Sequence, residues 1–392
     1  MKIIHTSDWH IGKIVNQVYM TEDQAVCLAS LIDLLREEQP DALVIAGDVY
    51  DRSIPPVEAV ELLDKTLSTI LLELKIPILM IAGNHDSPDR LGFGSHLLEA
   101  GGLYIAGPLT QQIKKVSLSD EYGPVHFYLL PYAPPALVRD VFQAEAARDH
   151  DSAMKVMIEA IQSDWDATAR NILVTHGFVR GIKELTLSES EKPLSYTLSI
   201  GGADYVDVEL FSGFTYTALG HLHRPQQAGT ERVRYAGSLL KYSASEVAQK
   251  KSVTLLTIGK DQAITIEEKV LQQKRDMRKV TGSIQELLMP DFLPEAAKND
   301  YLFVTLTDQA EILDPMGKLR TLYPNVLGLD FLRNEGAVSG EKTAAGEGYK
   351  QQGKLELFED FYGNMTGQTF DETKKQILAE VIAQVETAGR EE

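Results

Sequence analysis

The sequence is poor in cysteine, and it lacks an apolar run long enough to cross a membrane. Its 392 residues include one cysteine, Cys27, so the chain can form no internal disulfide. A single thiol suits a reducing compartment, and core packing is the role expected of Cys27. No stretch approaches the ~20 consecutive apolar residues of a membrane-spanning helix. Because the first residues enter an expected strand without a charged-then-apolar leader, we expect a cytoplasmic protein.

Basic residues are scarce relative to acidic ones. The chain has 38 Lys and Arg against 57 Asp and Glu, which gives a formal net charge of −19. Proteins that hold nucleic acid by bulk electrostatics carry a basic excess or a basic face, so this balance argues against that class. It does not exclude a nuclease, because metal ions supply positive charge locally and a partner can complete a DNA channel.

Short apolar runs alternate with amphipathic segments along the first hundred residues, which is the pattern of a layered α/β domain. We expect Thr21 to cap the first helix and prolines to open the second. The expected strands are 2–6, 42–46 and 76–82, and the expected helices are 21–38, 55–74 and 87–99.

The middle of the chain is less regular, and its composition changes after residue 270. One or two helices are expected over 134–161, with a polar break near His150. Residues 1–271 are expected to form the first domain, and the polar, basic stretch 272–279 opens a smaller domain at 272–334. Further strands are expected at 101–108, 125–132, 171–175, 216–219, 232–236, 252–258, 263–270, 301–307 and 326–332, with a short helix near 315–323.

The C-terminal part combines a predicted linker with two amphipathic helices. Residues 335–353 are rich in Gly, Ala, Lys and Glu without periodicity, as in a flexible linker. Helices are expected at 355–362 and 371–385, within a tail of 354–392. The apolar side of these helices includes Leu357, Phe358, Phe361, Ile377 and Val381.

Polar side chains suited to metal binding follow five of the expected strands. In open α/β sheets, ligands bind at the edge where the parallel strands end. We therefore expect the five segments to converge on Asp48. They are Asp8-Trp-His10, Gly47-Asp48, Gly83-Asn84-His85, Thr175-His176 and Gly220-His221-Leu-His223.

Together these segments offer enough oxygen and nitrogen donors for two divalent ions, with Asp48 as the bridge because a carboxylate has two acceptor oxygens. A set without thiolate favours Mn²⁺, Fe²⁺ or a catalytic Zn²⁺ over a closed structural zinc site, and the sequence does not choose among them. Two ions about 3.5–4 Å apart clamp a phosphate and activate a water, so the set predicts phosphoester hydrolysis. The donors are Asp8, His10, Asp48, Asn84, His176, His221 and His223.

The same motifs resemble those of the calcineurin-like metallophosphoesterases, and among them the SbcD family, the nuclease subunits of bacterial SbcCD complexes. The resemblance continues more weakly through the second domain. It rests on residues 4–13, 47–51, 83–90, 220–226 and 235–243, together with Glu246.

The resemblance implies a four-layer α-β-β-α sandwich, a smaller α+β capping domain and a C-terminal helical tail. It implies that His85 is the catalytic histidine, the alternative being that His85 only supports Asn84 or Asp86. Archaeal and eukaryotic relatives carry a second histidine where this chain has Asp51, so any role of that histidine cannot be carried over. One ion would take Asp8, His10, Asp48 and His223, and the other Asp48, Asn84, His176 and His221.

For activity, the resemblance implies a manganese-dependent exonuclease on duplex ends and endonuclease on single-stranded or hairpin DNA, acting in repair and recombination. It implies an SbcC-type ATPase as partner, a homodimer within a heterotetramer, and association with the nucleoid when the protein is on DNA. The tail is expected to bind the ATPase as helix anchors, the alternative being that it packs on its own catalytic domain.

Basic residues beside the motifs are candidates for contacts with DNA phosphates. The alternative for each is a local ion pair or an ordinary solvated surface position. These residues are Lys13, Arg52, Arg90, Arg180, Lys183, Arg224 and Lys241.

Two other functions compete with a nuclease role. A stand-alone metallophosphoesterase acting on small phosphodiesters or phosphoproteins has no evident need for the second domain and the apolar tail. A scaffold that has lost its chemistry would have no need for a complete set of metal ligands.

Overall fold

The computed structural model describes residues 1–163, 165–181, 185–188, 205–308, 310–332, 354–366 and 369–388. The chain forms two compact units, one of residues 1–306 and 310–330 and the other of residues 307–309 and 331–392. Within the described ranges, no helix is long and apolar enough to cross a membrane. The expected linker 335–353 and Lys183 lie outside the described residues.

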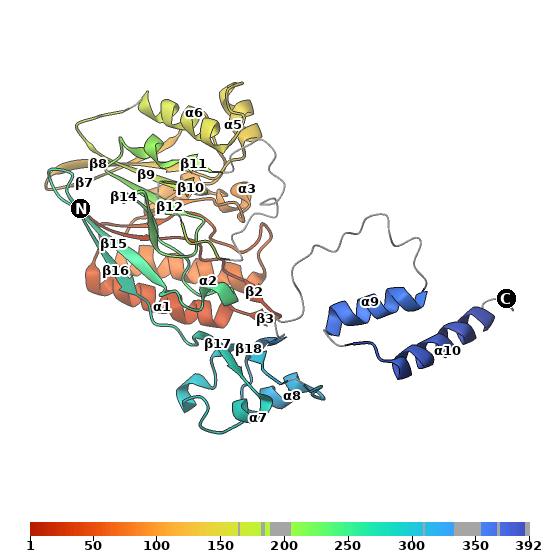
Figure 1. Cartoon of the computed structure of the whole chain (residues 1–392). Coiled ribbons are helices and arrows are strands. Elements are labelled where there is room, and N and C mark those ends of the chain that lie inside the picture. Colours follow the sequence, from red (N-terminus) through yellow and green to blue (C-terminus); the bar gives the residue numbers. More distant parts are fainter. Residues whose placement is uncertain are drawn as a thin grey trace. The chain divides into compact units, whose positions relative to one another are not determined.

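Two six-stranded sheets form the centre of the first unit (Figure 1). In each sheet four adjacent strands run parallel to one another, and antiparallel strands complete the sheet. The first sheet has the order β16 (Ile264–Val270), β15 (Ser252–Ile258), β1 (Lys2–Thr6), β4 (Ala42–Ile45), β5 (Ile78–Ile81) and β6 (Leu103–Ala106). The second has the order β13 (Gln226–Ala228), β14 (Thr230–Tyr235), β12 (Tyr216–Gly220), β9 (Arg170–His176), β8 (Gly123–Leu130) and β7 (Lys114–Asp120).

Side chains alternate between the two faces of each strand, and both faces of the inner strands are buried. On β4, Leu43 and Ile45 pack in the core beneath the helices α1 (Thr21–Glu38) and α2 (Val57–Ser68), whereas Val44 faces the core between the sheets. Burial on both faces explains why the inner strands are continuous apolar runs.

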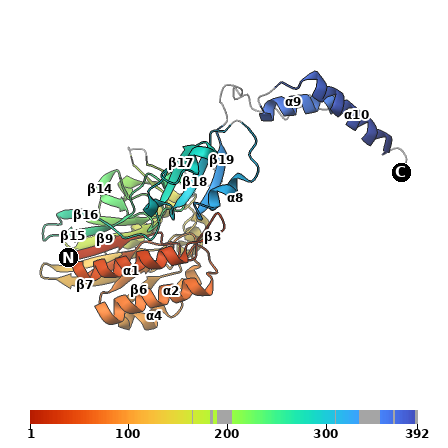
Figure 2. The ribbon, with the colours of Figure 1, turned by 90° about the horizontal axis from the view of Figure 1, so that it is seen from below.

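Helices cover the outer face of each sheet, which gives the expected four-layer α-β-β-α sandwich (Figure 1). The helices α1 and α2 lie side by side over the first sheet (Figure 2). Over the second sheet, α5 (Pro135–Phe142) and α6 (His150–Gln162) bury a separate core that includes Met157 and Leu173.

Three predictions about the helices of the first hundred residues need correction. Thr21 is the first helical residue and not the cap, which is Met20 and makes no side-chain hydrogen bond to the helix. The helix expected at 55–74 is α2 followed by a π-helical turn, Thr69–Leu74. The helix expected at 87–99 is broken into α3 (Pro88–Leu91) and α4 (Ser95–Leu98), because Gly94 between them adopts a left-handed conformation with φ of 70°.

Several strands were not predicted from the sequence, and the longest of them are β7 and β17 (Met277–Gly282). The edge strand β7 carries lysine, serine and aspartate and is mostly half-buried, so its apolar pattern is weak. The strand β17 begins in the polar, basic stretch 272–279, where apolar residues are too few to indicate a strand. The remaining short elements are β2 (Ile14–Val15), β3 (Val18–Tyr19), β10 (Val179–Arg180), β11 (Val206–Asp207) and 3-10 turns at Glu99–Gly101, Val208–Phe211, Ala244–Glu246 and Glu295–Ala297.

Residues 277–331 form a small three-stranded sheet with its own core. Its order is β17, β18 (Tyr301–Leu306) and β19 (Val326–Phe331), with the helices α7 (Ile284–Leu287) and α8 (Pro315–Arg320) packed against it. Buried Asp23 on α1 joins this sheet to the sandwich, because it accepts hydrogen bonds from Arg275 Nη1 at 2.6 Å and from the Tyr301 hydroxyl at 2.8 Å.

The second unit contains the two tail helices, α9 (Lys354–Thr366) and α10 (Glu372–Ala388). They pack on each other through Phe370, whose ring centroid lies 5.1 Å from that of Tyr362, and through an ion pair of 2.7 Å between Lys375 and Glu359. Leu357 is half-buried, whereas four other apolar side chains remain exposed. These are Phe358 (46%), Phe361 (58%), Ile377 (58%) and Val381 (48%).

Candidate metal centre

The polar segments predicted to converge do lie at one edge of the two sheets. Backbone hydrogen bonds join them: Asp8 N donates to Gly47 O at 3.0 Å, and His10 N donates to Asp48 O at 2.9 Å. The backbones approach so closely that a Cβ on Gly220 would lie 1.9 Å from the Ala46 oxygen. Glycine is therefore needed at that position.

Four of the site residues have a positive φ, which non-glycine residues adopt rarely, and His221 has the largest, at 111°. The other three φ angles are 51° at Asp8, 45° at His10 and 49° at Asp48. Strain of this kind persists where surrounding structure imposes it, and it gathers at functional sites.

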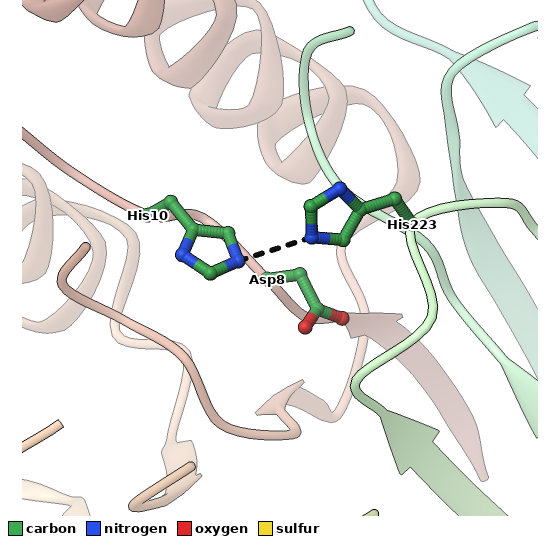
Figure 3. A group of neighbouring side chains, drawn as sticks. All are labelled: Asp8, His10 and His223. Atoms are coloured by element: carbon green, nitrogen blue, oxygen red, sulfur yellow. Dashed lines mark hydrogen bonds between the residues drawn. The ribbon is translucent and has the colours of Figure 1, made fainter. Parts of the chain in front are cut away.

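The first group of donors consists of Asp8, His10 and His223, all of them buried. Figure 3 shows the two imidazoles facing each other beside the Asp8 carboxylate, with 3.1 Å between His10 Nε2 and His223 Nε2. Their ligand atoms lie within 4.8 Å of one another. Burial lowers the pKa of His10 well below its ordinary value, which favours the neutral ring with a free lone pair, and burial raises the pKa of Asp8 to about 6.

The second group surrounds the oxygen of the Asn84 side chain. His176 Nε2 lies 2.9 Å from Asn84 Oδ1, and His221 Nδ1 lies 3.1 Å from the same atom. His176 Nε2 is also 3.4 Å from Asp48 Oδ2. Asn84 is exposed and His221 is half-buried, so this side of the centre is the accessible one.

Asp48 lies between the two groups. Its Oδ2 is 3.4 Å from His176 Nε2 and 3.7 Å from His10 Nε2, while its Oδ1 accepts a hydrogen bond of 2.9 Å from the His85 amide. One carboxylate oxygen therefore faces both groups. Although burial opposes the charge, nearby His176 holds the pKa of Asp48 well below its usual range, and Asp48 in turn raises the pKa of buried His176 to about 9.

Hydrogen bonds behind the imidazoles fix which nitrogen faces the centre. His176 Nδ1 donates to the Ala46 oxygen at 2.8 Å, so Nε2 is left for the site. His223 Nδ1 lies 3.2 Å from the Glu246 carboxylate, which forms a fully buried ion pair of 2.6 Å with Lys251. Such partners orient metal-binding histidines and raise their basicity. No pattern in the sequence marks Lys251 for this position.

His85 stands beside the centre and is half-buried. Its Nδ1 lies 2.9 Å from the Asp51 carbonyl oxygen, and its ring centroid is 4.8 Å from that of His10. When Nδ1–H donates to this carbonyl, Nε2 is the nitrogen that remains available for proton transfer. Asp51 also binds Lys13, at 2.6 Å.

Asp86 holds the two loops at Asp48 and His85 together. Its carboxylate accepts hydrogen bonds from the amides of Val49 at 3.1 Å, Tyr50 at 2.9 Å and Gly83 at 2.9 Å. Burial raises its pKa to about 6. Asp86 thus joins these two loops through its carboxylate.

The candidate DNA contacts fall into two groups. Lys13 is engaged with Asp51, and Lys241 binds Asp276 at 2.7 Å with 10% of its side chain exposed. The other described candidates are accessible. Arg224 donates to Thr186 Oγ1 at 2.9 Å, Arg180 lies 5.1 Å from the ring of Tyr205, and Arg52 and Arg90 are exposed.

The donor set fits divalent metal ions. Carboxylate oxygens, an amide oxygen and imidazole nitrogens converge without thiolate. Two buried imidazole nitrogens, His10 Nε2 and His223 Nε2, lie 3.1 Å apart, and a cation bound by both would stabilise this arrangement. The centre is thus typical of a metal-dependent phosphoesterase.

Comparisons with known proteins agree with this geometry. The calcineurin-like phosphoesterase family matches residues 1–225, and the type 5 capsule protein repressor C-terminal domain matches residues 273–366. The chain therefore belongs to the calcineurin-like phosphoesterase family. The fold expected from the motifs is confirmed, and the membership implies divalent metal ions.

The chain is also similar over almost its whole length to the SbcD subunit of the nuclease SbcCD from Staphylococcus epidermidis. The two are 35% identical over 383 residues, which is 98% of each chain. The predicted relation to the SbcD family is confirmed.

Among solved structures, the protein TT1561 of Thermus thermophilus matches with a TM-score of 0.40 and 12% identity, covering 68% of this chain and 98% of the other. A dimetal phosphatase from Danio rerio matches with a TM-score of 0.42 and 12% identity, covering 69% and 96%.

Proposed function

We propose that this chain is a DNA nuclease with two divalent ions, manganese being the native metal, and that it acts with an SbcC-type ATPase in DNA repair and recombination. The observation that carries the proposal is the convergence of six residues with oxygen or nitrogen donors around Asp48, with His85 beside them. The name of the Staphylococcus epidermidis relative, that of a nuclease component, supports DNA as the substrate.

The assignment of ligands follows the two groups of donors. Asp8, His10 and His223 would hold one ion, Asn84, His176 and His221 the other, and Asp48 would contribute to both. When bound, two such ions polarise the phosphodiester and activate a water for in-line attack. Because the Asn84 amide is neutral, its site carries less negative charge than a site with a carboxylate at that position would. Asn84 is also exposed, so a phosphate can approach from that side.

His85 is assigned as the general acid. Nδ1–H donates to the Asp51 carbonyl, which fixes the ring, and a proton on Nε2 is delivered to the leaving sugar oxygen. The proton neutralises the negative charge that develops on this oxygen as the P–O bond breaks. Asp51 thus acts on the ring through its backbone, whatever side chain stands at that position.

DNA would reach the centre along the accessible arginines. Arg52, Arg90, Arg180 and Arg224 are exposed and can contact phosphates on either side of the cleaved bond. Lys13 and Lys241 are already in ion pairs and are weaker candidates. The acidic chain requires further positive charge for tight DNA binding, which the ATPase partner would supply.

The tail is proposed as the site of that partner. Its exposed side chains Phe358, Phe361, Ile377 and Val381 are suited to a hydrophobic groove, with half-buried Leu357 beside them. In this assignment residues 1–271 form the nuclease domain, 272–334 the capping domain, 335–353 a linker and 354–392 the partner-binding tail. The assembly is a homodimer of this chain within a heterotetramer.

The deciding experiment compares three substrates with purified protein and Mn²⁺. Duplex ends and single-stranded or hairpin DNA should be cleaved, by exonuclease and endonuclease action respectively, and Asp48→Ala should be inactive on both. If only a small aryl phosphodiester or a phosphoprotein is hydrolysed, the chain is a stand-alone phosphoesterase and the nuclease proposal is wrong.

A further inference from the structure

An apolar cavity of about 210 Å³ opens beside the metal centre. One wall is formed by Asn84, His176 and His221, the three residues assigned above to one ion. The cavity is therefore continuous with the place where a phosphodiester would bind. A group attached to that phosphodiester reaches the cavity without crossing any other part of the protein.

Most of the remaining lining is apolar. The helix α6 contributes Ala153, Met154 and Met157, all of which are buried, and Phe178 and Val206 complete this side. Among the described residues that line the cavity there is no lysine, arginine, aspartate or glutamate. Away from the metal ligands, an ionic group would find no lysine, arginine or carboxylate partner in this lining, so the cavity favours a neutral occupant with an apolar face.

Aromatic rings and sulfur give the cavity the character of a stacking site. The ring of Tyr132 contacts two histidine rings. Its centroid lies 6.0 Å from that of His150 at an interplanar angle of 30°, and 6.3 Å from that of His176 at 87°. Aromatic side chains stack with any base, and methionine side chains adapt to irregular shapes. The lining thus suits a planar heterocycle without selecting one in particular.

We propose that this cavity receives the base of the nucleotide whose phosphate lies at the metal centre. The proposal rests on the nuclease function above, and it specifies the form of the substrate. A base inside the cavity cannot remain stacked in a duplex. Since extracting a base costs least when it is already unpaired, the cavity favours cleavage at single strands and frayed ends.

Binding of two small ligands in the presence of Mn²⁺ separates the base from the phosphate. The ligands are dAMP and 2-deoxyribose 5-phosphate, which differ only in the adenine, and calorimetry gives both dissociation constants. Base stacking of the usual strength predicts that dAMP binds about 5- to 150-fold more tightly. Equal affinities in the wild-type protein would overturn the proposal.

A matched pair of variants on one helix tests the location. Ala153→Leu fills the cavity and should abolish the preference for dAMP while leaving the affinity for 2-deoxyribose 5-phosphate unchanged. Ala160→Leu adds the same volume to α6 where it lines a different groove, and it should keep the wild-type preference. A dAMP preference that survives in Ala153→Leu contradicts the proposal.

Two further controls keep the outcome decisive. If melting curves show that Ala153→Leu is unfolded, Met157→Ala takes its place, because it removes a wall contact and should reduce the preference at least about threefold. A protein that prefers dAMP but leaves DNA intact refutes the nuclease function alone. A protein that cleaves DNA without any base preference refutes this inference alone.

Discussion

The buried pair of Glu246 and Lys251 makes Glu246→Gln a strong test of how the site is built. Both side chains are 0% exposed, and Lys251 Nζ lies 2.6 Å from Glu246 Oε2. The same ammonium donates to the His223 carbonyl at 2.8 Å and to Ser238 Oγ at 2.9 Å. Although burial opposes it, the charge of Lys251 holds the pKa of Glu246 well below its usual value, so the carboxylate is ionised at neutral pH.

Glutamine preserves the size of the side chain and removes its charge. The ammonium of Lys251 is then buried without a counter-ion, and breaking a buried pair in this way costs about 3–5 kcal/mol. For a domain of this size that corresponds to a fall in melting temperature on the order of 10 °C. His223 also loses the carboxylate behind its Nδ1, and removing such a partner weakens metal binding about 10- to 100-fold.

The assay measures melting in chelator and then titrates Mn²⁺ into each variant. Lys251→Met should be destabilised as well, whereas Glu246→Gln with Lys251→Met should recover most of the stability, because replacing both charges removes the uncompensated one. The double variant should nevertheless keep the weakened metal site. A Glu246→Gln protein that melts like the wild type, or a double variant equal to the sum of the singles, would refute the reasoning.

Three other predictions concern separate parts of the molecule. His85→Gln should retain its metal and lose DNA cleavage about 10²- to 10⁴-fold, whereas equal loss of metal and activity in parallel measurements would make His85 structural. Asp120 binds Arg170 at 2.5 Å and the N-terminal ammonium at 2.6 Å, and these contacts, with a hydrogen bond from the Tyr122 amide, lower the pKa of Asp120. Its contribution to stability is therefore present above about pH 4 and is lost as pH falls further. Asp120→Asn should therefore lower the urea midpoint at pH 7, by an amount that shrinks toward pH 3, and a constant difference would contradict this. Truncation before Lys354 should leave an Mn²⁺-dependent nuclease with an unchanged melting temperature, and this protein should no longer co-purify with an SbcC-type ATPase. If the truncated protein unfolds, or still binds the ATPase, the tail is not a separate partner-binding element.

The strands that carry the site were predictable because both of their faces are buried. Continuous apolar runs such as 42–46 differ clearly from amphipathic helices, and each is followed by a polar residue at the sheet edge. The convergence on Asp48 follows from parallel strands that end at one edge. The ligand roles of these residues stay predictions until metal binding is measured.

Features that depend on tertiary contacts were not predictable. The helix α1 begins without a side-chain cap because Met20 is held by the hairpin of β2 and β3, through a backbone bond to Lys13. Lys251 acquires its role only because the turn before β15 buries it against Glu246 and His223. Likewise, the cavity joins Tyr132 to methionines of α6, which no local periodicity links to the metal centre.

The most direct test of the central claim is the metal content of Asp48→Ala, measured together with DNA cleavage. Wild-type protein loaded with Mn²⁺ should hold two ions per chain and cleave single-stranded DNA. Because Asp48 Oδ2 faces both groups of donors, the variant should hold fewer ions and show no cleavage. Two ions per chain and continued cleavage in Asp48→Ala would contradict the shared metal centre.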